Sequence, residues 1–148
     1  MSLLPYLEFV PLLGERIFIA AGARVIGRAT LGDHENIWFN TVIRADVNTI
    51  TIGKNTNVQD MCMFRVTELN SVTVGENTSF GHSVTLHGCK IGNGCLIGMG
   101  AIILDGAEIG DNCLVAAGSL VTPGKKFPAG SMIKGRPASV DRPLTPEE

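Results

Sequence analysis

Residues 91–121 read IGNGCLIGMGAIILDGAEIGDNCLVAAGSLV, and an aliphatic residue returns at every sixth position of this stretch. Glycine often follows the aliphatic residue, and a small residue often stands four positions after it. This period matches neither the helical period of about 3.6 residues nor the simple alternation of a flat strand. A six-residue unit fits a short strand followed by a corner, and three such units close one triangular coil. The stretch therefore predicts an all-β, single-stranded parallel β-helix with the aliphatic and small residues inside.

The same register extends over most of the chain, with a few irregularities. One residue is missing before Ile91, and three extra residues precede Ile52. We expect an inserted loop at residues 66–73 and a short excursion through residues 123–128, after which Ile133 closes the pattern. The predicted inward positions are Ile19, Val25, Leu31, Ile37, Ile43, Ile52, Val58, Phe64, Val74, Phe80, Leu86, Ile91, Ile97, Ile103, Ile109, Val115, Val121 and Ile133.

The length and composition indicate a single domain over residues 1–148. Hydrophobic residues make up 45% of the chain and charged residues 18%, so a sizeable core can form. We expect a lead-in at residues 1–16, repeats over about 17–135, and a tail at residues 136–148 with a short or absent C-terminal helix.

Charge and hydropathy exclude several classes of partner. The formal net charge of −2 leaves no basic surface for nucleic acid or for an anionic membrane. The apolar start lacks the basic region of a signal peptide, and no stretch approaches the roughly 18 apolar residues of a membrane span. We therefore expect a cytoplasmic protein.

The four cysteines fit the interior of the predicted β-helix. Cys62, Cys95 and Cys113 occupy the inward small position, and Cys89 stands where the register loses one residue. No CxxC pair suggests a zinc ribbon or a redox motif. Core packing as free thiols is the better interpretation.

Polar residues recur on two faces of the predicted prism. The position after the aliphatic residue on one face is Arg44, then Arg65, then His87, and these side chains should stack about 4.8 Å apart. On another face, His82 should stand directly above Asp60. Because the two histidines lie on different faces, one chain cannot easily close a site with both. A head-to-tail contact would bring them together, and around a threefold axis such contacts close into a homotrimer. Exposed histidines without any ligand are the alternative.

Five segments give the chain a resemblance to γ-class carbonic anhydrases of the hexapeptide-repeat superfamily. The resemblance runs from about residue 15 to residue 144. It rests on IWFNTVIRAD (37–46), IGKNTNVQD (52–60), GHSVTLHGC (81–89), IGMGAIILDGA (97–107) and KGRPASVDRPL (134–144). It implies left-handed coils, a trimer, and zinc or another divalent metal held by three histidines across each subunit interface.

One of the three metal ligands implied by the resemblance is replaced. The two histidines of GHSVTLHGC are His82 and His87, but the third ligand, six positions after Gln59, is Arg65. Arginine has no lone pair to donate and carries a charge that repels a dication. The substitution predicts a degenerate metal site, better suited to an anion or a neighbouring carboxylate.

The remaining site residues implied by the resemblance are present. Arg44 and Asp46 correspond to residues that tie subunits together by ion pairs, and Asp60 corresponds to a partner across the interface. Gln59 matches a residue near the bound solvent or substrate, and Asn57 matches a supporting polar residue. Gln59 and Asn57 are therefore the candidate catalytic residues.

Four functions remain open at this point. The leading hypothesis is a γ-carbonic anhydrase-like homotrimer, weak or inactive in CO2 hydration, with a small molecule or anion at the subunit interfaces. The alternatives are an active metal-dependent carbonic anhydrase using His82 and His87, a CoA-dependent acyltransferase with a histidine as general base, and a non-catalytic assembly protein.

Overall fold

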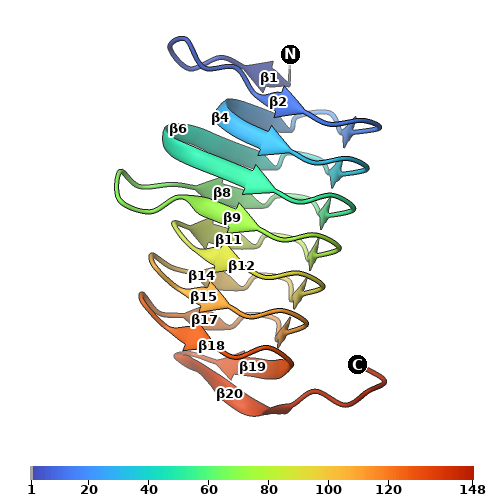
Figure 1. Ribbon diagram of the computed structural model, residues 1–148, viewed down its shortest axis with the longest axis vertical. Coiled ribbons are helices and arrows are strands. Elements are labelled where there is room, and N and C mark those ends of the chain that lie inside the picture. The colour runs from blue at the N-terminus through green and yellow to red at the C-terminus, as the bar shows by residue number, and fades with distance from the viewer. Residues whose placement is uncertain (1) are drawn as a thin grey trace.

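Successive coils of the chain stack into a triangular prism, a left-handed parallel β-helix of about seven turns (Figure 1). The structure is a computed structural model that describes residues 2–148, and these residues contain strands and no helix. No helix long and apolar enough to cross a membrane is therefore present in the described part. The strands are β1 (Leu3–Leu4), β2 (Leu12–Leu13), β3 (Phe18–Ile19), β4 (Arg24–Leu31), β5 (Asn36–Ile37), β6 (Val42–Ile52), β7 (Asn57–Val58), β8 (Met63–Arg65), β9 (Val72–Val74), β10 (Ser79–Phe80), β11 (Thr85–His87), β12 (Lys90–Ile91), β13 (Leu96–Ile97), β14 (Ile102–Ile103), β15 (Glu108–Ile109), β16 (Leu114–Val115), β17 (Leu120–Val121), β18 (Lys126–Phe127), β19 (Ser131–Gly135) and β20 (Ala138–Pro143).

All strands except β20 pair in parallel with strands of the neighbouring coils, which produces three faces. The first face carries β1, the start of β4 and of β6, then β8, β11, β14 and β17. The second carries β2, the end of β4 and of β6, then β9, β12, β15 and β18. The third carries β3, β5, β7, β10, β13, β16 and β19, and β20 closes it with the one antiparallel pairing between named strands in residues 2–148.

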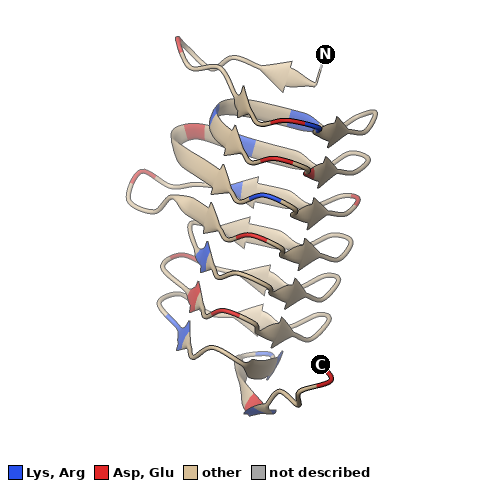
Figure 2. Cartoon of the chain, turned by 45° about the vertical axis from the view of Figure 1, so that its right-hand side comes forward, with Lys and Arg blue, Asp and Glu red and all other residues tan. Residues whose placement is uncertain are grey.

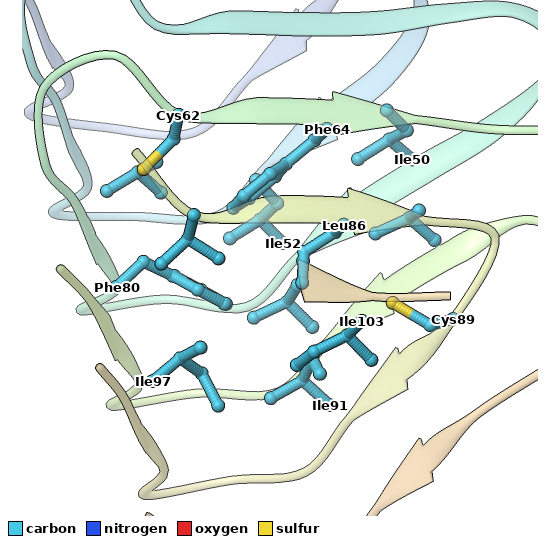
Figure 3. Packing of buried hydrophobic residues seen from close by; sticks show 14 of the residues in the cluster. Ile50, Ile52, Cys62, Phe64, Phe80, Leu86, Cys89, Ile91, Ile97 and Ile103 are labelled. Atoms are coloured by element: carbon cyan, nitrogen blue, oxygen red, sulfur yellow. The ribbon is translucent and has the colours of Figure 1, made fainter. Parts of the chain in front are cut away.

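The predicted inward residues form one continuous core along the prism. All of those from Val25 to Ile133 are buried, and Ile19 is partly buried at the N-terminal end. Phe64 and Phe80 meet edge to face near the middle, with ring centroids 4.9 Å apart (Figure 3). The four cysteines are free and buried in this core, which confirms their interpretation as packing residues.

Two predicted irregularities are smaller than the repeat pattern indicated. Val66 and Val72 are both buried, so the chain leaves the coil only between them. The predicted excursion through residues 123–128 is wrong: Phe127 lies in β18, pairs with Ile109 and occupies the inward position. The register therefore runs unbroken to Ile133.

The coils also extend into the N-terminal segment that precedes the clear repeats. Leu3 and Leu4 in β1 pair with β4, and β2 pairs with the end of the same strand. The three extra residues before Ile52 are absorbed by β6, which continues around a corner for 11 residues. At the other end of the prism, β20 turns back along β19 (Figure 1).

Candidate functional site

The predicted ladder of basic side chains is present on the first face. Arg44 in β6 pairs in register with Arg65 in β8, and Arg65 pairs with His87 in β11. Each follows a buried residue, and because neighbouring side chains on a strand point to opposite sides, all three project outward. Elsewhere on the prism basic and acidic residues are interleaved (Figure 2). The ladder thus places two guanidinium groups and an imidazole next to one another on one face.

A single carboxylate, Asp46, pairs with the two arginines of this ladder. Its oxygens lie 3.3 Å from Nη1 of Arg65, with hydrogen-bond geometry, and Oδ2 lies 3.3 Å from Nε of Arg44. The Arg44 contact is an ion pair only, because that Nε has no hydrogen-bond partner within residues 2–148. Burial would raise the pKa of Asp46, but a hydrogen bond from the Val47 N–H and the charges of Arg65 and Arg44 outweigh it, so the pKa is lowered. Asp46 is therefore ionised at neutral pH.

The Asp46 contact decides where the Arg65 guanidinium points. Asp46 belongs to β6, one coil before Arg65, whereas His87 lies one coil after it. Arg65 is thus held toward β6 and its charge is partly neutralised within the same chain. The residue that the resemblance places at the third ligand position is therefore an arginine paired with a carboxylate of its own chain.

His87 has a carboxylate partner that the sequence pattern did not reveal. Nδ1 of His87 lies 2.5 Å from Oδ1 of Asp105, which stands in the corner after β14. Both side chains are partly exposed. The C-terminal end of the ladder is therefore a separate histidine and aspartate pair.

His82 forms a second such pair on the third face, as the register predicted. Its Nδ1 lies 3.1 Å from Oδ2 of Asp60 in the preceding coil. The two residues border an open hollow of about 380 Å³, and the side chain of His82 is 53% exposed. The hollow is lined by Asn36, Trp38, Asn57, Gln59, Asp60 and His82.

The candidate catalytic residues share this hollow, but they are not equally free. Asn57 accepts a hydrogen bond of 2.8 Å from the indole Nε1 of Trp38, which fixes its amide. Gln59 has no such side-chain bond within the described residues. Gln59 is therefore the amide available to a small ligand beside His82.

A single chain does not bring the predicted metal ligands together. His82 follows β10 in the eight-stranded sheet, and His87 ends β11 in the twelve-stranded sheet. Among residues 2–148 no group of three or more His, Cys, Asp or Glu side chains could hold a metal ion. With Arg65 paired to Asp46, these residues do not fit a three-ligand zinc centre.

The repeat and the coil geometry define the class of the chain. Residues 88–123 match the bacterial transferase hexapeptide (six repeats) family, and residues 71–104 match the hexapeptide repeat of succinyl-transferase. A solved hexapeptide transferase family protein from Anaplasma phagocytophilum superposes with a TM-score of 0.95 at 38% identity, over 99% of this chain and 86% of that one. The chain is a hexapeptide-repeat protein.

Sequence relatives give the family more closely. The chain is 41% identical over 144 residues to the carbonic anhydrase of Geobacillus kaustophilus, covering 97% of this chain and 79% of that protein. It is 37% identical over 144 residues to the mitochondrial gamma carbonic anhydrase 2 of Arabidopsis thaliana, covering 93% of this chain and 52% of that protein. The chain belongs to the γ-carbonic anhydrase-like family of hexapeptide-repeat proteins.

Proposed function

We propose that the protein is a γ-carbonic anhydrase-like homotrimer with a degenerate interfacial metal site, and that it hydrates CO2 weakly or not at all. The observation that carries this proposal is Arg65, which stands beside His87 in the ladder and is tied to Asp46. Zinc in carbonic anhydrases lowers the pKa of bound water to about 7 and so supplies hydroxide. A guanidinium in place of one imidazole removes a lone pair that would bind the metal, and its positive charge repels a dication.

The proposed site forms where the first face of one copy meets the third face of another. There, His87 and Arg65 of one chain would lie near His82 and Gln59 of the next. Arg65 brings a positive charge and N–H donors but no lone pair, so the site suits a small oxyanion or carboxylate more than a metal ion, although Asp46 neutralises part of that charge. Arg44, Asp46 and Asp60 would help to hold the subunits together.

Acyl transfer from a CoA donor is the second candidate function. It is favoured by the pairing of His87 with Asp105, because a histidine held by a carboxylate is a common general base. An active metalloenzyme using His82, His87 and waters would need a metal held by only two protein ligands. A non-catalytic assembly role requires neither histidine.

Restoring the missing ligand tests the proposal. In Arg65→His, three imidazoles should meet at each interface and bind zinc with one open position for water. Zinc at a hundredfold above its dissociation constant should stabilise the assembled protein by about 2.7 kcal/mol. The measurement is the zinc dependence of the melting temperature, which should rise in Arg65→His but not in wild type.

Two variants control for placement and for general effects of the substitution. Arg44→His moves the new histidine one coil down the same ladder and also removes an arginine from Asp46, yet it should not gain zinc binding. Adding His82→Ala to Arg65→His should abolish the zinc effect. Stoichiometric zinc in wild type, with CO2 hydration as fast as in zinc-bound relatives, would overturn the proposal, as would trimeric Arg65→His that binds no more zinc than wild type.

A further inference from the structure

The corner that follows His87, between β11 and β12, is one residue shorter than the corresponding corner of the next coil, between β14 and β15. Five positions separate Leu86 from Ile91, but six separate Ile103 from Ile109, although the first members of the two pairs are in register. The backbone N–H of Gly106 donates to the carbonyl of Gly88, at 2.7 Å. Leu86 therefore aligns with Ile103, and Gly88 aligns with Gly106. Between these aligned residues the later coil has one residue more than the earlier coil, and the extra residue is Asp105.

A glycine in the short corner leaves room for the Asp105 side chain. Gly88 has a φ of 56°, which favours glycine. A Cβ there would lie 3.0 Å from Oδ1 of Asp105 and 2.7 Å from Cβ of Asn70. Any other residue would crowd both neighbours. The shorter corner and its glycine together allow Asp105 to reach down to Nδ1 of His87.

This contact has a definite consequence for the imidazole. An ionised carboxylate can only accept a hydrogen bond, so neutral His87 must carry its proton on Nδ1 to bond Asp105. Nε2 is then left with a free lone pair. Carboxylates fix metal-binding and basic histidines in the same way in many sites.

We propose that Asp105 is a positioning residue that holds His87 in the Nδ1–H tautomer and so presents Nε2 to the subunit interface. The role of that nitrogen at the interface rests on the proposed function, but the tautomer is a property of this chain alone. It also defines the ligand class. Because Arg65 offers hydrogen-bond donors and Nε2 of His87 offers an acceptor, the ligand expected there carries both an anionic oxygen and a hydroxyl or amine that can donate.

The small number of histidines makes the tautomer directly measurable. The chain has three, and His34 makes no side-chain hydrogen bond within residues 2–148, so it serves as an internal reference. Long-range 1H–15N spectra of chelator-treated protein report which ring nitrogen is protonated, once the pH has been raised until the spectra no longer change and the imidazoles are neutral. We expect His87 to be protonated on Nδ1 in wild type.

Two substitutions separate positioning from a general structural effect. In Asp105→Ala the proton of His87 should move to Nε2, while His34 should not change. In Asp105→Asn the amide oxygen can still accept from Nδ1, so the wild-type tautomer should be retained.

The wild-type spectrum alone can overturn the proposal, so it does not depend on a variant that folds. Protonation of His87 on Nε2 in wild type would refute it, as would an unchanged tautomer in folded Asp105→Ala. Because the protein is metal-free here, failure of the zinc test with Arg65→His would not affect this result, and the two proposals fail separately.

Discussion

At the scale of the residue, Glu35 is the side chain least suited to its surroundings. It is fully buried in an inward column where the coils that follow carry small residues. That column continues through Thr56, Thr78, Cys95, Cys113 and Ser131. Oε1 of Glu35 accepts the Gly32 N–H at 2.5 Å, but Oε2 has no partner in the described residues. Burial raises the pKa of Glu35 to about 9, although the Gly32 bond opposes the shift.

Glu35→Thr should therefore stabilise the protein, by more as the pH rises. A threonine in this column can donate to a backbone carbonyl, as Thr78 does to Gly92 at 3.0 Å. In wild type, the unfolded chain loses the Glu35 proton near pH 4.5 and the folded chain near pH 9. Wild-type stability falls between these values, by at most about 1.4 kcal/mol per pH unit, and the variant lacks this loss. Melting temperatures of the two proteins should diverge from pH 5 to about pH 8.

Glu35→Gln is the matched control, because it keeps the volume and removes the ionisable group. It should share the pH profile of Glu35→Thr without the added hydroxyl bond. A constant gap in melting temperature between wild type and both variants would contradict the raised pKa.

At the scale of the element, the six-residue period predicted nearly every inward position, because stacking coils bury the same register repeatedly. It failed at β18, where Pro123, Gly124 and Pro128 resemble loop signals. In a β-helix each strand is so short that such residues simply form the corners, and Phe127 between them keeps the register. The Asp105 contact was missed for another reason. The missing residue before Ile91 was visible in the sequence, but the side chain that fills the resulting space depends on corner geometry.

Because each coil contacts mainly its neighbours, Phe127→Ala should loosen one end of the prism. The lost packing should cost about 3 kcal/mol, and hydrogen exchange should accelerate in β15, β18 and β20 while β5 and β7 stay protected. Phe80→Ala is the control, since Phe80 packs against Phe64 in the middle and should accelerate exchange on both sides. Uniform acceleration in Phe127→Ala would show that the prism unfolds as one unit.

At the scale of the whole molecule, the residues of the proposed interfacial site lie on two different faces of one chain. The ladder register and the stacking of His82 over Asp60 could be predicted because a fixed period determines which residues are neighbours. How two chains meet depends on surface shape and exposed apolar area, and no period encodes these. Part of the exposed apolar surface lies close to His82. The corners after β5, β7 and β13, in line with His82, expose large apolar side chains: Phe39, Met61 and Met99 are 45%, 59% and 58% exposed.

If these corners form the subunit interface, a charge placed there should prevent assembly. Wild type should sediment near 47 kDa, three times the 15.7 kDa of one chain. Met61→Glu would bury an unpaired carboxylate in the interface and should sediment as a monomer. Leu12→Glu is the matched control, because Leu12 is 66% exposed on β2 of the second face and should remain trimeric when substituted. Sedimentation velocity at micromolar concentration distinguishes the two. If Leu12→Glu dissociated while Met61→Glu did not, the chains would meet through another face, and His82 of one copy could not reach His87 of the next.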